Sequence, residues 1–79
     1  MEKIKKILLE INDNVDYEKE HALLTNGVID SVELVELVTK LEEEYEIEIP
    51  LDEISPENFD SMTGILYMIE QIQKQKIEK

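Results

Sequence analysis

The side chains with the clearest chemical potential stand where a helical segment should begin. Asp30-Ser31-Val32-Glu33 has the pattern of a capping box, in which Asp30 is the N-cap and Glu33 follows three residues later. With Asp30 as the cap, Ser31 takes the first helical position and its hydroxyl need not bond the backbone. That hydroxyl would project outward, beside unsatisfied N–H groups and the positive end of the helix dipole. A phosphate ester on Ser31 would be electrostatically favoured there.

Other candidate groups carry less chemistry. Asp60-Ser61 also precedes an apolar residue at a predicted helix start, but its helix carries only Glu70 as an acid and ends in lysines, so we interpret Ser61 as a plain cap. His21 has no nucleophile or second ligand beside it. The acidic run 12–16 lacks the glycine and the bidentate glutamate of a calcium loop. There is no Cys, which excludes thiolate metal sites and thiol catalysis. We therefore expect no catalytic and no metal-ligating residue.

Apolar spacing predicts the elements that position these groups. Residues 2–12 have apolar side chains at helical intervals and form a first helix, which a long polar connection with a turn at Asn26-Gly27 follows. The second helix is predicted from about Asp30 to Tyr45. The apolar stripe that should face its core consists of Leu34, Val38, Leu41 and Tyr45, widened by Val35 and Leu37.

Two further helices complete the predicted fold. Ser55-Pro56 places a good N-cap before a proline at the first helical position, which predicts a short helix over roughly residues 56–60. The last helix should begin near Ser61 and fray past Gln73. The fold class is therefore all-α, a four-helix bundle with a long first loop and a short third helix, and we expect residues 1–79 to be a single domain.

Acidic side chains dominate the composition. The chain has 20 Asp+Glu against 8 Lys+Arg, a formal net charge of −12 at pH 7, and all of the excess lies between residues 20 and 60. Nucleic acid and an anionic membrane surface are not expected partners, because both need clustered cations. No segment approaches the ~20 apolar residues of a membrane span, and the N-terminus lacks a signal-peptide pattern. We expect a cytoplasmic monomer.

The order of these motifs resembles the acyl carrier protein family along essentially the whole chain. The matching segments are Gly27-Val28-Ile29-Asp30-Ser31, the acidic run VELVELVTKLEEEYEIEIP and the trailing SPENFDSMTGILYMI. The resemblance implies that 4′-phosphopantetheine is attached to the motif serine, which is Ser31 here. It also implies a phosphopantetheinyl transferase that uses coenzyme A and magnesium, and acyl or aminoacyl groups carried as thioesters on the arm's terminal thiol.

The resemblance further implies a surface for partner enzymes. Such carriers present an acidic second helix to basic patches on loading ligases and on downstream transferases or synthases, and complementary charge speeds association without requiring tight binding. By this resemblance, the partner-binding residues are Asp30, Val32, Glu33, Glu36, Thr39, Glu42 and Glu43. Lys40 interrupts the acidic set, and Gly27 belongs to the motif with the cap residues.

Details of the motif leave the carried group open. Fatty-acid carriers usually have Asp-Ser-Leu with one residue between Gly and Asp, whereas this chain has Val32 and two intervening residues. That spacing is similar to D-alanyl carriers and some peptidyl carrier domains, while the helix from Val35 to Ile49-Pro50 is similar to the fatty-acid type. Fatty-acid, polyketide, nonribosomal-peptide and D-alanine pathways all remain. An alternative from another class is an unmodified acidic helical module that binds a basic protein.

Overall fold

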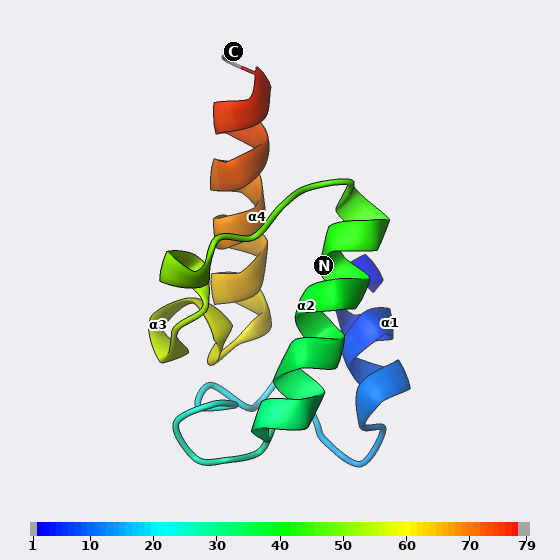
Figure 1. The fold of residues 1–79 in the computed structure, drawn as a ribbon. Helices are drawn as coiled ribbons and strands as arrows, with labels where there is room; N and C mark the ends of the chain where they lie inside the picture. The colour runs from blue at the N-terminus through cyan, green and yellow to red at the C-terminus, as the bar shows by residue number, and fades with distance from the viewer. Residues whose placement is uncertain (1, 78–79) are drawn as a thin grey trace.

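Four α-helices and one 3₁₀ turn make up the regular structure of the computed structural model, which describes residues 2–77 (Figure 1). They are α1 (Glu2–Ile11), α2 (Ser31–Tyr45), η1 (Leu51–Glu53), α3 (Pro56–Phe59) and α4 (Met62–Ile77). α2 and α4 run in the same direction and α1 runs opposite to them (Figure 1). The predicted all-α bundle is confirmed, but η1 was not predicted and α4 continues past Gln73 to Ile77.

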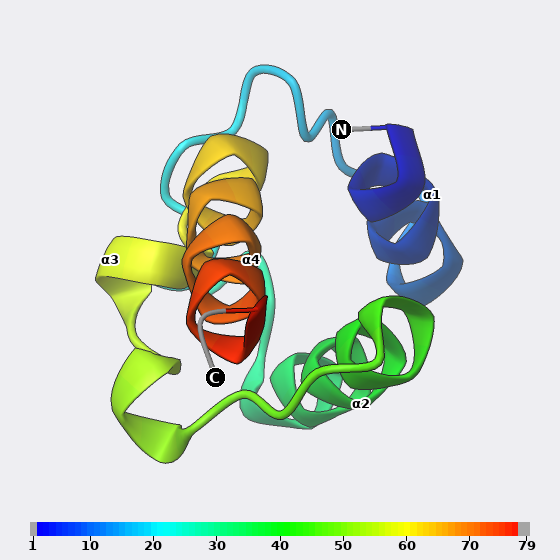
Figure 2. The same cartoon turned by 90° about the horizontal axis from the view of Figure 1, so that it is seen from above.

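The helices share one apolar core. α1 packs against α2 and α4, and α3 packs against α4, so that the long helices surround a common interior (Figure 2). Its buried side chains are Ile4, Ile7, Leu8, Tyr17, Leu23, Ile29, Leu37, Leu41, Ile47, Ile49, Phe59, Met62, Ile65, Met68 and Ile69. Burial of apolar area on this scale is the main favourable term in folding. Among the helices described, none has the length and apolar character that crossing a membrane requires.

The inward face of α2 differs from the predicted stripe. Leu37 and Leu41 are fully buried, whereas Leu34 and Val38 are only half-buried. Val35, which we assigned to the edge of the stripe, is 66% exposed. The buried stripe is therefore centred on Leu37 and Leu41, to one side of the predicted line, because α1 packs against that side of α2. Val35 is left on the outer surface.

A buried tyrosine holds the start of the long connection 12–30. The Tyr17 hydroxyl shares its one proton between the Leu8 carbonyl at 3.1 Å and the Asn12 carbonyl at 2.7 Å. The Asn12 carbonyl lies just past the end of α1, where no further turn of helix satisfies it, whereas the Leu8 carbonyl also accepts the Asn12 N–H at 2.9 Å. Burial raises the pKa of the Tyr17 phenol, and the charges of Glu33 and Asp13 raise it further. The phenol therefore stays neutral and remains a donor at neutral pH.

The short α3 is fixed by its contact with α4. Ser55 is the N-cap of α3 as predicted, but its side chain makes no capping hydrogen bond. The helix start is favoured instead by Pro56 at the first helical position, where proline's fixed φ suits a helix and its missing N–H is not needed. A Cβ built on Gly64 would lie 2.9 Å from the backbone oxygen of Asn58. Gly64 therefore permits the α3 backbone to approach α4 closely. A side chain at this position would collide with the backbone of Asn58.

Candidate attachment site at the start of α2

Asp30 caps α2 with both halves of the predicted capping box. The Glu33 N–H donates to Asp30 Oδ1 at 2.8 Å, and the Asp30 N–H donates to Glu33 Oε1 at 3.2 Å. Asp30 itself has extended backbone angles, φ −86° and ψ 179°. Two of the otherwise orphaned N–H groups at this helix end are therefore satisfied reciprocally by the two carboxylates.

This capping arrangement leaves the Ser31 hydroxyl unoccupied. Ser31 is the first residue of α2 and is exposed, and its side chain takes part in no hydrogen bond among residues 2–77. An exposed hydroxyl with no intramolecular partner fits the covalent attachment of a phosphate ester, because attachment disrupts no existing bond. The helix N-terminus beside it favours the negative charge of such an ester.

The loop that leads to Ser31 turns at Gly27 and is anchored in the core by Ile29. Gly27 has φ +70°, a left-handed conformation that glycine adopts without steric cost, and open space surrounds the position where a Cβ would stand. The Ile29 N–H donates to the Leu23 carbonyl at 3.0 Å, and both side chains are buried. This hydrogen bond closes the turn and fixes the backbone immediately before Asp30.

Asp60 ties this loop to the junction of α3 and α4. Its Oδ1 accepts the N–H groups of Leu24 at 2.8 Å and Thr25 at 2.9 Å, and its Oδ2 accepts the Thr25 hydroxyl at 2.6 Å. The side-chain bond from Thr25, followed by the backbone bond from Thr25, holds the pKa of Asp60 below its usual value. The carboxylate therefore persists well below neutral pH, and its bonds weaken only as the pH falls through that lowered pKa.

The neighbouring Ser61 behaves as the sequence predicted. Its Oγ accepts the Gly64 N–H at 3.1 Å, which is the bond of a helix N-cap, and its side chain is half-buried. Ser61 therefore has the capping role that Asp30, not Ser31, has at the start of α2. The contact between Asp60 and the loop was not predicted from the sequence, since it joins residues 35 and 36 positions apart.

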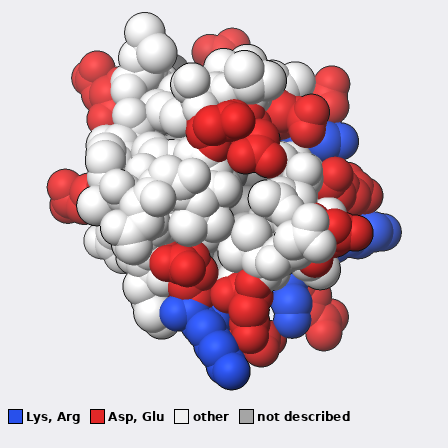
Figure 3. Space-filling model, turned by 90° about the horizontal axis from the view of Figure 1, so that it is seen from below, with Lys and Arg blue, Asp and Glu red and all other residues white. Residues whose placement is uncertain are grey.

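The outer face of α2 carries exposed apolar side chains beside acids. Val32 and Val35 are 77% and 66% exposed, and Glu36, Thr39 and Glu43 are exposed along the same side of the helix. Seen from the end of the bundle at which α2 begins, uncharged atoms cover much of the surface and acids gather in separate groups around it (Figure 3). Val35 lies on the same face as the predicted partner-binding residues, although the apolar pattern had assigned it to the edge of the stripe that faces the core.

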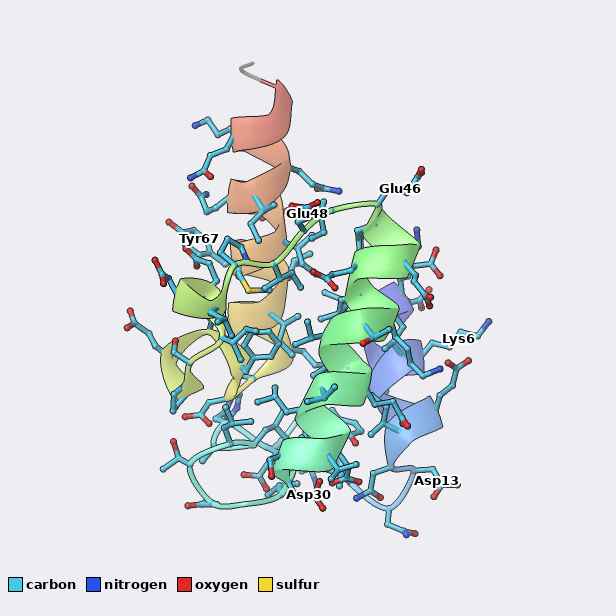
Figure 4. All side chains as sticks on the ribbon, viewed as in Figure 1. Lys6, Asp13, Asp30, Glu46, Glu48 and Tyr67 are labelled. Carbon is cyan, nitrogen blue, oxygen red and sulfur yellow. The ribbon has the colours of Figure 1, made fainter. Side chains whose placement is uncertain are left out.

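Three other residues of α2 that we predicted to lie on its surface already interact with other parts of the protein. Glu42 is half-buried, and one of its carboxylate oxygens accepts the Ile49 N–H at 2.9 Å. Glu33 is also half-buried, in the capping box. Lys40 does not interrupt the outer face, because its Nζ lies 3.7 Å from Glu10 of α1. Asp30 lies at the lower end of α2 and Glu46 at the upper end (Figure 4).

Comparison with known proteins identifies the family. The family described as "Phosphopantetheine attachment site" matches residues 3–66, which include the whole of α2 and the loop before it. The chain belongs to this family. Members of the phosphopantetheine family carry 4′-phosphopantetheine covalently and act as carriers rather than catalysts, and as a class they interact with phosphopantetheinyl transferases and with ligases or transferases.

Individual relatives agree with the family. The chain is 28% identical over 75 residues to proteins named D-alanyl carrier protein from Streptococcus pyogenes serotype M5 (strain Manfredo), serotype M49 (strain NZ131) and serotype M1. Each comparison covers 89% of this chain and 95% of the relative. No solved structure matches the chain significantly. Among the residues described, no group of three or more His, Cys, Asp or Glu side chains could hold a metal ion.

The capping geometry makes a prediction about stability. Ser31→Ala should change the free energy of unfolding by no more than about 0.5 kcal/mol, since the hydroxyl is exposed and makes no intramolecular bond. Asp30→Ala should lower it by about 1 kcal/mol, because the Glu33 N–H loses its acceptor. Urea unfolding monitored by circular dichroism measures both. A larger loss for Ser31→Ala than for Asp30→Ala would contradict the assignment of Asp30 as the cap.

Proposed function

We propose that Ser31 carries the 4′-phosphopantetheine arm of this family member. The observation that carries the proposal is the division of roles at the start of α2, where Asp30 makes the capping bonds and the exposed Ser31 hydroxyl makes none. When bound, the arm supplies a terminal thiol on which a carried group is held as a thioester. The chain's own residues present the hydroxyl and offer helix N–H groups beside the ester's negative charge.

We propose that the outer face of α2 is the surface that partner enzymes recognise. Val32 and Val35 supply exposed apolar area next to the attachment residue, and Glu36 and Glu43 supply charge that basic patches attract. Glu42 is retained as a weaker contact, because its bond to the Ile49 N–H already uses one of its carboxylate oxygens. The partners are a phosphopantetheinyl transferase, a loading ligase and downstream transferases.

We propose that the carried group is D-alanine. Two observations support this choice over fatty-acyl or polyketide cargo: the relatives named D-alanyl carrier protein, and the two residues, Val28 and Ile29, that separate Gly27 from Asp30. We further propose that residues 1–79 act as one carrier domain in the cytoplasm and catalyse nothing themselves. The single shared core supports the assignment of one domain.

The attachment site is tested by intact mass spectrometry. Incubation with coenzyme A, magnesium and a promiscuous phosphopantetheinyl transferase should add one phosphopantetheine to the wild type and to Ser61→Ala, but none to Ser31→Ala. Ser61→Ala is the matched control, because both serines follow an aspartate at a helix start. An unmodified wild type would favour an acidic binding module without carrier duty. Modification of Ser31→Ala would show that the attachment residue lies elsewhere.

The carried group is tested on the modified protein. With ATP and a D-alanine-activating ligase, the arm should gain one alanyl group, which hydroxylamine releases as expected of a thioester. The same protein should gain nothing from a fatty acid and an acyl-carrier synthetase. The apo protein is the control for non-specific acylation. Loading of the fatty acid in preference to D-alanine would place the chain in a fatty-acyl pathway instead.

Charge reversal on α2 tests the recognition surface. Glu36→Lys combined with Glu43→Lys should lower the transferase's kcat/KM by roughly tenfold at low salt. The loss should be smaller at high salt, because salt screens the attraction between the acids of α2 and the transferase in the wild type as well. Stability should stay equal or rise, because two repelling charges are removed. Glu57→Lys combined with Glu70→Lys, on α3 and α4, is the matched control with two exposed acids elsewhere. Equal losses for the control would mean that net charge, not this face, is recognised.

A further inference from the structure

In the part of the chain that the structure describes, the loop before Ser31 is hydrogen-bonded to the α3–α4 junction through a single residue, Asp60. Residues 25–27 are exposed, and Asp60 is the one side chain outside the loop that the structure shows hydrogen-bonded to residues 23–29. Its three bonds are short and charge-assisted, a class that is stronger than neutral hydrogen bonds. The Asp60 carbonyl adds a fourth contact, since it accepts the Leu23 N–H at 3.0 Å.

These contacts reach Ser31 through a short chain of bonded residues. Leu23, which the Asp60 carbonyl holds, accepts the Ile29 N–H, and Ile29 immediately precedes the cap residue Asp30. The backbone around Leu24 and Thr25 therefore sets the position of the segment that enters α2. The exposed Gly27 turn between these points has no side chain to restrain it. Without the Asp60 carboxylate, the turn would be held by backbone bonds and by the Leu23 and Ile29 anchors alone.

We infer that Asp60 is a positioning residue for the modification of Ser31, because its carboxylate holds the loop at Leu24 and Thr25 in the conformation that presents the Ser31 hydroxyl to the transferase. The inference rests on the proposed function, in which Ser31 takes the arm. Asp60 touches neither the hydroxyl nor the arm's donor and acts only through the loop. The lowered pKa of the carboxyl agrees with a carboxylate that accepts several hydrogen bonds in the folded protein.

A positioning role predicts a specific kinetic pattern. If the competent loop conformation falls to roughly one tenth of the population, the apparent KM for the carrier rises about tenfold while kcat is kept, since a bound carrier is already in the competent state. Asp60→Ala should show this pattern. Asp60→Asn should fall between Asp60→Ala and the wild type, because its amide oxygen can still accept the Leu24 and Thr25 N–H groups.

Matched variants separate the loop from charge and from global stability. Glu57→Gln removes an exposed acid of α3 that makes no side-chain hydrogen bond or ion pair with the loop, and it should leave KM within about twofold of the wild type, as expected for a surface charge at moderate salt. Thr25→Val removes the 2.6 Å hydrogen bond from the Thr25 hydroxyl to Asp60 and should raise KM. Thr25→Ser keeps a hydroxyl and should have the KM of the wild type. These changes leave the core untouched, and circular dichroism checks that each variant stays helical.

Amide hydrogen exchange gives a readout that needs no transferase. In Asp60→Ala, the Leu24 and Thr25 amides should exchange at least roughly tenfold faster than in the wild type, while amides in the middle of α2 keep their rates. A faster loop together with a raised KM and unchanged kcat supports the inference. If KM is unchanged in helical Asp60→Ala and Thr25→Val while the wild type is modified normally, this inference is wrong and the proposed function stands. A wild type that takes no arm defeats the proposed function and this inference together.

Discussion

The capping of α2 by Asp30 is the interaction on which the chemistry of this chain depends. Every helix start leaves N–H groups that need acceptors, and serine is among the residues that satisfy them best. If Ser31 supplied the cap, its oxygen would be committed to the backbone and attachment of an arm would uncap the helix. Because Asp30 and Glu33 make the reciprocal bonds, the Ser31 hydroxyl makes no intramolecular bond, and the proposed attachment of an arm would leave the cap in place.

The acidity of the chain is tolerated because it is kept on the surface. No charged side chain is fully buried among the residues described, and the ion pairs of Lys3, Lys5 and Lys40 lie on the surface. Such pairs contribute little, at most about 1 kcal/mol each. The apolar core therefore carries the stability, and the exposed acids of α2 are not needed for it. In the proposed function, their mutual repulsion is the cost of a surface that attracts basic enzymes.

Local signals in the sequence were sufficient for the helices and for the cap. The capping box, the Pro56 start and the fold class all depend on residues within a few positions of one another, and the structure has each of them. The errors lie where tertiary packing decides. Val35 and Leu37 were both predicted to widen the stripe, yet Leu37 is fully buried and Val35 is 66% exposed, because the helical period defines a stripe but not which part of it neighbouring helices cover. The Asp60 contact with Thr25 joins segments 35 residues apart, and no local pattern announces it.

The two Asp-Ser pairs show how completely the surrounding fold sets the chemistry of a dipeptide. At the start of α2 the aspartate caps and the serine is free, whereas at the start of α4 Ser61 caps and Asp60 is free to bond elsewhere. That freed carboxylate reaches the loop of the first pair, at Leu24 and Thr25. Neither arrangement would serve in the other place: a capping Ser31 could not accept an arm, and a capping Asp60 could not hold the loop. The role that we propose for Ser31 therefore depends on both pairs together.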